Sequence, residues 1–266
     1  MDGRQSEPLV VDSAALIERL RALASAHANP LLAFDGDGTL WSGDVGEDVF
    51  QAAVSQGLLR EAALPALELE AKAHGVEAHG SASEIAARLF AAYLDHRYPE
   101  RDACAMMTWC YAGMRRDELV ELARSTFVAR GLEQRLHREL APILAFARGA
   151  GLRSVVVSAS PQPIVETAAF AWQFDPGDIT ASRAADHAGR ILARLAVPVP
   201  YAEGKPIALG ALAPGAALLA AFGDNVFDIE LFQSAVLAVA VRPKAALKRR
   251  FSELPSLCVL AATSES

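Results

Sequence analysis

The sequence is poor in cysteine, in aromatic side chains and in positive charge. Three of its 266 residues are cysteines, aromatic residues make up 7%, and the formal net charge is -7. The widely spaced Cys104, Cys110 and Cys258 contain no C-x-x-C pair, so neither a disulfide framework nor a zinc knuckle is indicated. The acidic balance argues against the broad basic surface that nucleic acid or an anionic membrane requires.

The sequence also has no long apolar run. The longest one, at residues 211–222, is interrupted by Pro214 and Gly215, whereas a membrane-spanning helix needs about 20 predominantly apolar residues. The first residues show no apolar stretch behind a basic start, which argues against an export signal. We therefore expect a cytoplasmic protein whose partners include neither a nucleic acid nor a membrane. The sequence predicts no oligomeric state.

What the sequence does contain is a series of short apolar runs separated by helical patterns. Hydrophobic residues make up 52% of the chain, and runs of this kind are typical of buried parallel strands that end in a loop. Helical patterns, such as the apolar spacing in residues 136–147, lie between them. This alternation predicts a doubly wound, Rossmann-like parallel α/β sheet in a three-layer sandwich. The expected strands are residues 31–34, 155–157, 179–181, 218–222, 236–240 and 256–260.

Residues 44–134 interrupt this alternation, because they carry helical signals and no strand candidate. One such signal is the capping box formed by Ser81 and Glu84, which precedes an apolar helical face. We therefore predict an inserted helical cap domain at residues 44–134. Residues 1–43 and 135–266 would form the α/β core domain.

Polar side chains gather at the ends of three expected strands. In an open parallel sheet, ligands bind beyond the carboxyl ends of the strands, where the strand order reverses. Carboxylates, hydroxyls and one ammonium meeting there predict a metal-assisted phosphate site. The residues are Asp35, Asp37 and Thr39 after the first strand, Ser158 after the second, Lys205 before the fourth, and Asp224 and Asp228 after it.

The same residues carry a resemblance to a known family. Asp35 to Thr39, Ser158, Lys205 and the segment Gly223 to Asp228 resemble, in order, the four signature motifs of haloacid dehalogenase superfamily phosphatases. The match covers the whole core domain. The tripeptide Gly204-Lys205-Pro206, the surroundings of Ser158 and the helical insertion are similar to the branch that contains phosphoserine phosphatase.

This resemblance implies a mechanism. Asp35 would attack phosphorus and become an aspartyl phosphate, and Asp37 would act as general acid and then general base. Mg²⁺ would be held by Asp35, Asp224 and the backbone carbonyl of Asp37, because this hard cation prefers oxygen ligands. Asp228 would lie next to the metal and orient a ligand or Lys205.

The resemblance also implies which groups bind the phosphoryl oxygens. Lys205 and the hydroxyls of Ser158 and Thr39 would do so, with help from the loop amides around Gly36 and Gly38. The substrate would be a small phosphorylated metabolite, since a helical cap closes over such a molecule and excludes water.

The substrate itself is harder to predict. Phosphoserine phosphatases bind the substrate amine with a Glu shortly after the first motif, and Asp44 stands at the matching position here, with Glu47 one turn later. Both are candidates for substrate specificity. Met107 stands where that family has the cap arginine that binds the serine carboxylate, so phosphoserine is disfavoured. Three other cap arginines could supply a cation: Arg88, Arg97 or Arg101.

Other functions stay open on the sequence alone. A phosphotransferase or phosphomutase would keep both aspartates, Asp35 and Asp37. A phospho-accepting binding module would keep Asp35 and Lys205 but not turn over, and Asp37 disfavours it. A dehalogenase would lack the second aspartate, because a halide leaving group needs no acid.

Overall fold

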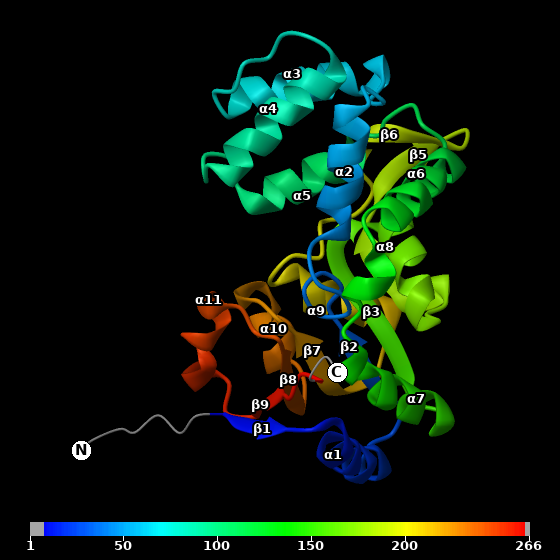
Figure 1. Cartoon of the computed structure of the whole chain (residues 1–266), viewed down its shortest axis with the longest axis vertical. Coiled ribbons are helices and arrows are strands. Elements are labelled where there is room, and N and C mark those ends of the chain that lie inside the picture. The colour runs from blue at the N-terminus through cyan, green and yellow to red at the C-terminus, as the bar shows by residue number, and fades with distance from the viewer. Residues whose placement is uncertain (1–7, 264–266) are drawn as a thin grey trace, which may run out of the picture.

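The computed structural model describes residues 8–263 and is built on one parallel sheet (Figure 1). Its seven strands lie in the order β1-β9-β8-β7-β2-β3-β4, and every pair is parallel. The strands are β1 (Leu9–Val11), β2 (Pro30–Phe34), β3 (Arg153–Pro161), β4 (Ile179–Ser182), β7 (Ala217–Gly223), β8 (Leu237–Val241) and β9 (Leu257–Leu260).

The strand order reverses at β2. From β2 the chain proceeds through β3 to β4 on one side, and returns through β7 to β8 and β9 on the other. Such a reversal opens a crevice at the carboxyl ends of the central strands. Of the predicted polar residues, Asp35, Asp37 and Thr39 follow β2, and Asp224 and Asp228 follow β7. Ser158 lies within β3, which extends further than predicted, and Lys205 lies in α9.

Two apolar layers cover the sheet, one on each face. Side chains alternate along a strand, so Leu32 and Phe34 of β2 belong to one buried cluster while Leu31 and Ala33 belong to the other. Phe34 stacks on Phe222 of β7 with ring centroids 4.3 Å apart. The predicted three-layer, doubly wound α/β fold is therefore confirmed.

Six helices belong to these layers. α1, α7 and α8 contribute to the cluster of Phe34, and α9, α10 and α11 to that of Ala33. Their bounds are α1 (Ser13–Ala26), α7 (Ala141–Gly149), α8 (Gln162–Ala169), α9 (Gly204–Leu212), α10 (Ile229–Gln233) and α11 (Ala245–Lys248). None of the helices in residues 8–263 is long and apolar enough to cross a membrane.

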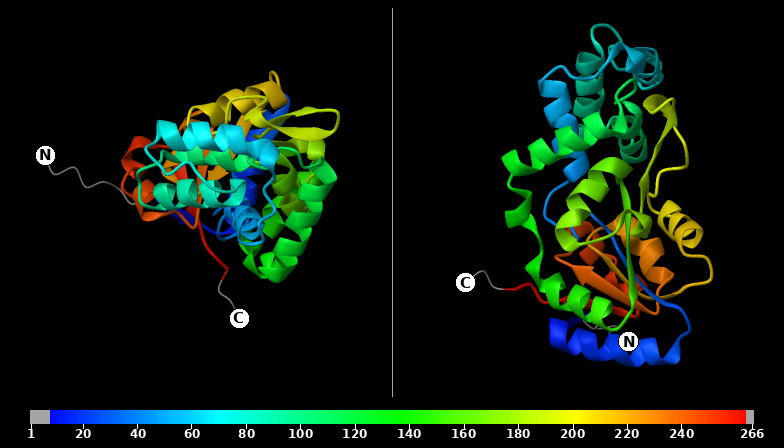
Figure 2. Two further views of the ribbon diagram at one scale, coloured as in Figure 1. Left: turned by 90° about the horizontal axis from the view of Figure 1, so that it is seen from above. Right: turned by 90° about the vertical axis from the view of Figure 1, so that its right-hand side faces the viewer.

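Five helices between β2 and α7 form a group at one end of the molecule, beyond the carboxyl ends of the strands (Figures 1 and 2). They are α2 (Val45–Ser55), α3 (Leu64–Ala73), α4 (Ala82–Leu94), α5 (Glu100–Trp109) and α6 (Arg116–Ala129). Their apolar faces share one continuous cluster with the Phe34 face of the sheet. The division into a core and a cap at residues 44–134 stays a prediction.

An antiparallel hairpin of β5 (Ala184–His187) and β6 (Arg190–Leu195) extends from the sheet towards these helices (Figure 1). The Gly113 amide donates to the Ile191 carbonyl at 2.8 Å, and the Ile191 amide to the Met114 carbonyl at 2.9 Å. The predicted core residues 184–195 thus contact the segment after α5. The six predicted strands are all present within a few residues of their expected ends, but β1 and this hairpin were not predicted.

Candidate active site

The first functional loop continues the ladder of β2. The Asp35 amide donates to the Phe222 carbonyl of β7 at 2.9 Å. Asp35 is therefore fixed directly after the last residue of the buried strand. The next residues form a tight turn, in which the amides of Leu40 and Gly38 donate to the carbonyls of Gly36 and Trp41, each at 2.8 Å. A side chain at the carboxyl end of a central strand is thereby held in a fixed place.

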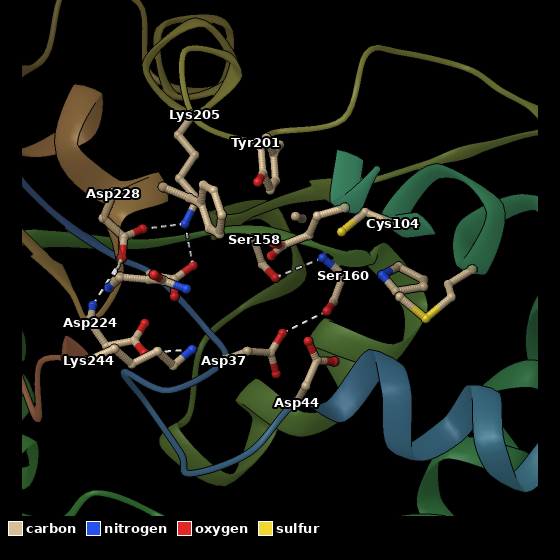
Figure 3. A pocket seen from close by; sticks show the side chains of 17 residues that line it. Asp37, Asp44, Cys104, Ser158, Ser160, Tyr201, Lys205, Asp224, Asp228 and Lys244 are labelled. Atoms are coloured by element: carbon tan, nitrogen blue, oxygen red, sulfur yellow. Dashed lines mark hydrogen bonds and ion pairs between the residues drawn. The ribbon is translucent and has the colours of Figure 1, made fainter. Parts of the chain in front are cut away.

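Lys205, Asp35 and Asp228 form a buried ion triad, of which Figure 3 labels Lys205 and Asp228. Lys205, from the first turn of α9, donates to Asp35 Oδ1 at 2.6 Å and to Asp228 Oδ1 at 2.5 Å. The second Asp228 oxygen accepts the backbone amides of Asp224 at 3.0 Å and Asn225 at 2.9 Å. All three charged side chains are buried. Since buried charges require partners, this network accounts for each of them.

Asp224 adds a third carboxylate. Its Oδ2 lies 3.0 Å from the Lys244 ammonium, and its buried Oδ1 has no hydrogen-bond partner among residues 8–263. Oxygens of Asp35, Asp224 and Asp228 all lie within 4.8 Å of one another. Three carboxylates this close, one with an orphan oxygen, form a site suited to a hard cation.

Burial and the neighbouring charges shift the pKa values of Asp35, Asp224 and Lys205. Burial raises the pKa of Asp35, against the opposing charge of Lys205. Burial and then the charge of Asp228 raise the pKa of Asp224 to about 6. Burial alone would lower the pKa of Lys205, but Asp228 and Asp35 outweigh it and raise that pKa. For both carboxyl groups, burial outweighs the nearby ammonium groups of Lys205 and Lys244, and a bound cation would favour their ionised forms further.

Asp37 points into the same crevice but has different partners (Figure 3). Its Oδ2 accepts the Ser160 hydroxyl at 2.6 Å, and its Oδ1 accepts the Trp41 indole N–H at 2.8 Å and the Val45 amide at 2.7 Å. These donors come from β3, the turn after β2 and the start of α2. The orientation of the Asp37 carboxyl group is therefore fixed by partners that do not belong to the ion triad.

The structure brings most of the predicted residues into one cavity. Ser158, whose hydroxyl accepts the Ser160 amide at 3.1 Å, lines it. Thr39 does not line this cavity, and its buried hydroxyl has no hydrogen-bond partner in the described range, residues 8–263. The other predicted residues in the lining are Asp35, Asp37, Asp44, Lys205, Asp224 and Asp228.

The phosphate-binding role of the two predicted glycines, Gly36 and Gly38, stays a prediction. Neither Gly36 nor Gly38 lines the cavity, and the Gly38 amide is already bonded to Trp41. Gly38 has a φ of +83°, and a Cβ there would lie 2.2 Å from Asp224 Oδ2. Glycine is required because Asp224 packs against the backbone and because this φ disfavours other residues.

The two predicted specificity residues differ in placement. Asp44 lines the cavity, and its Oδ1 also accepts the Glu47 amide at 2.8 Å as the N-cap of α2. Glu47 is not part of the lining, and burial raises the pKa of its carboxyl group. Met107, at the position of the missing arginine, lines the cavity as well.

Sequence reasoning missed Ser160, Trp41 and Lys244. Each has a weak signal in the sequence: Ser160 lies two residues after Ser158, Trp41 lies two residues after the first motif, and Lys244 follows the apolar run of β8. Weak signals of this kind cannot be separated from ordinary loop residues until the strands are placed side by side.

The family model for haloacid dehalogenase-like hydrolases matches residues 32–233. The chain belongs to this family. The matched range contains all the charged residues of the ion triad and both aspartates of the first motif. No curated protein matches the sequence.

Solved structures share the fold of this haloacid dehalogenase-like hydrolase. A protein of unknown function from Bordetella pertussis Tohama I has a TM-score of 0.69 at 19% identity, over 88% of this chain and 99% of its own. A hydrolase of the same family from Salmonella enterica has a TM-score of 0.56 at 15% identity, over 89% and 74%. A substrate-bound phosphoserine phosphatase has a TM-score of 0.53 at 15% identity, over 88% and 93%. The predicted likeness to the phosphoserine phosphatase branch is confirmed for the fold.

Proposed function

We propose that this hydrolase is a Mg²⁺-dependent phosphomonoester hydrolase that acts on a small organic phosphate through an aspartyl phosphate on Asp35. One observation carries the proposal: Asp35, Lys205 and the Oδ1 atom of Asp224 lie in one cavity with Asp37. The Asp37 carboxyl group has hydrogen-bond partners of its own, outside the ion triad. A nucleophile, a cation for the phosphoryl oxygens and a separate acid are the parts that phosphoryl transfer requires.

The residues fit a divalent cation. Asp35 and Asp224 would hold Mg²⁺, with the Asp37 carbonyl as a predicted third ligand, while Asp228 orients Lys205. When bound, the ion neutralises charge on the phosphoryl oxygens and keeps Asp35 ionised. The Oδ1 atom of Asp224, which accepts no hydrogen bond from the described part of the chain, supports this assignment.

The protein's own groups then divide the reaction into two steps. The Asp35 carboxylate attacks phosphorus, the bond from phosphorus to the leaving oxygen breaks, and Asp37 donates a proton to that oxygen. Next, Asp37 takes a proton from water, the water oxygen attacks phosphorus, and the bond to Asp35 breaks to release inorganic phosphate. Lys205 and Ser158 bind the phosphoryl oxygens in both steps.

The direct test is a screen of phosphate monoesters with and without Mg²⁺, in which released inorganic phosphate is measured. Phosphate release that depends on Mg²⁺ supports the proposal. Transfer of the phosphoryl group to a sugar or alcohol, with little free phosphate, would favour a phosphotransferase instead. A stable aspartyl phosphate with negligible turnover would favour a phospho-accepting module.

Asp37→Asn is expected to lower kcat by roughly 10²–10⁴-fold, the usual contribution of a positioned general acid. The amide keeps the acceptor for Trp41 and Val45 but has no acidic proton to give. Phosphate binding, measured by calorimetry with Mg²⁺ present, should be retained. Wild-type turnover in this variant would remove Asp37 from the acid role.

Gly38→Ala is expected to abolish measurable Mg²⁺ binding, because the new Cβ would lie 2.2 Å from Asp224 Oδ2 and displace that carboxylate. Gly57→Ala is a matched control: Gly57 also has a positive φ, +63°, but has nothing within 4 Å of its Cβ position. Both variants should lose about 1 kcal/mol or more of stability from backbone strain. Calorimetry with Mg²⁺ separates them, and unchanged Mg²⁺ affinity in Gly38→Ala would contradict the metal assignment.

A further inference from the structure

A second cluster of metal-ligating side chains lies in the helical group, outside the active cavity. It consists of Glu70 of α3, His74 at the end of that helix, and Asp102 of α5. One ligand atom from each residue lies within 4.8 Å of the other two. None of the three residues lines the active cavity. Since α3 and α5 both belong to the helical group at one end of the molecule (Figure 1), this cluster is separate from the site proposed for Mg²⁺.

The chain brings these side chains together at the junction of two helices. Glu70 and His74 are four residues apart, so they lie one turn apart on the same side of α3. Asp102 is in the first turn of α5. The buried Tyr98, just before α5, joins the two helices: its hydroxyl lies 2.9 Å from Glu70 Oε1 and 2.9 Å from the Asp102 carbonyl oxygen. The Glu70 carboxylate is thereby held beside the start of α5.

The distances in the cluster match those between ligands of one small cation. His74 Nε2 lies 3.3 Å from Glu70 Oε1 and 3.8 Å from Asp102 Oδ2. Nitrogen and oxygen ligands lie about 2.0–2.1 Å from a zinc ion, so two ligands of a tetrahedral site are about 3.3–3.4 Å apart. Small side-chain shifts therefore suffice to bring all three atoms onto one ion.

The charge of the cluster also favours a cation. Within residues 8–263, Glu70 and Asp102 form ion pairs with His74 alone, and an imidazole is charged only when it is protonated. Arg101, the neighbour of Asp102 in the chain, acts on it through its charge but pairs with Glu203. With a neutral imidazole, the two carboxylates have no cation in direct contact.

The types of ligand decide which metal suits the cluster. An imidazole nitrogen suits zinc and similar transition metals, whereas Mg²⁺ prefers oxygen ligands. Two carboxylates balance the charge of a divalent ion. The side chains of Glu70, His74 and Asp102 are 29%, 24% and 42% exposed. An ion can therefore enter from solvent, and water can complete its coordination.

We propose that Glu70, His74 and Asp102 form a binding site for a divalent transition metal such as Zn²⁺, which links α3 to α5. The site does not depend on the proposed phosphatase function, because it shares no residue with the active cavity. It bears on that cavity all the same, since Glu100 and Met107 of α5 belong to the lining. A metal that ties α5 to α3 would stabilise this wall of the cavity.

The first test is calorimetry of Zn²⁺ binding to the full chain in excess Mg²⁺. The wild type should show a Zn²⁺ site whose affinity falls by at least about tenfold in His74→Gln and in Asp102→Asn, since each change removes a ligand. His79→Gln is the matched control. His79 also lies close to a glutamate, at 3.1 Å from Glu77, but forms no three-residue cluster within residues 8–263, so this variant should bind Zn²⁺ like the wild type.

The second test is thermal unfolding, which also shows that each variant folds. Zn²⁺ at about 100 times its Kd should raise the unfolding midpoint by at least about 3 °C in the wild type and in Asp224→Asn, but not in His74→Gln. Absence of Zn²⁺ binding in the wild type, equal affinity in His74→Gln, or loss of the site in Asp224→Asn would overturn the proposal. Neither test measures phosphate release, so a failure of the phosphatase function would leave these results unchanged.

Discussion

Asp35→Asn is expected to lower phosphatase turnover by on the order of 10⁴-fold or more, the usual result of removing a nucleophile. An amide is a poor nucleophile towards phosphorus, so no aspartyl phosphate can form. Asn has nearly the shape of Asp and leaves Lys205 paired with Asp228 at 2.5 Å. The free energy of unfolding should therefore change by no more than about 1 kcal/mol.

The measurement has two parts. Phosphate release is followed for wild type, for Asp35→Asn and for Asp186→Asn, an exposed aspartate of β5 that should have wild-type activity. Mass spectrometry of acid-quenched wild type should then find a phosphoryl group on the peptide that contains Asp35. Full turnover in Asp35→Asn, or a phosphoryl group on another residue, would remove Asp35 from the nucleophile role.

Lys205→Met is expected to lose both activity and stability. The change removes the buried cation and leaves the carboxylates of Asp35 and Asp228 facing each other without compensation. Loss of one partner of a buried ion pair costs about 3–5 kcal/mol, and loss of a phosphoryl-binding cation should lower kcat/KM by at least about 10³-fold.

The stability loss should depend on pH. Burial already raises the pKa of Asp35, and removal of Lys205 raises it further. A carboxyl group with a raised folded-state pKa costs stability above its unfolded value, about 3.9, and this cost disappears as pH falls towards that value. Denaturant unfolding should thus show a larger loss at pH 7.5 than at pH 4.5. Lys248→Met, at an exposed lysine of α11, serves as the control and should show neither effect.

Much of the core could be predicted from apolar runs alone. A strand buried on both faces needs continuous hydrophobic residues, and β2, β7 and β8 have them. β1 has no such signature: it is an edge strand of three residues in which Leu9 and Val10 are 63% and 64% exposed. Its place beside β9 is decided by pairing, not by local composition.

The hairpin of β5 and β6 could not be predicted from the sequence, for a different reason. Its turn passes through Ala188 and Gly189, both with positive φ. Alanine rarely adopts that conformation, so the residues lack the Asn-Gly or Gly-Gly signal of a tight hairpin turn. Contacts of Ile191 with Gly113 and Met114 hold the hairpin in place.

By itself, the sequence determined which chemical groups stand at the ends of which strands, since hydrophobic runs and turn residues act over a few neighbouring positions. Tertiary structure alone decided which charges are paired: Lys205 and Asp35 are 170 residues apart in the chain and 2.6 Å apart in space. Long-range partners and burial set the electrostatics of a site, and neither is a property of a local stretch of residues.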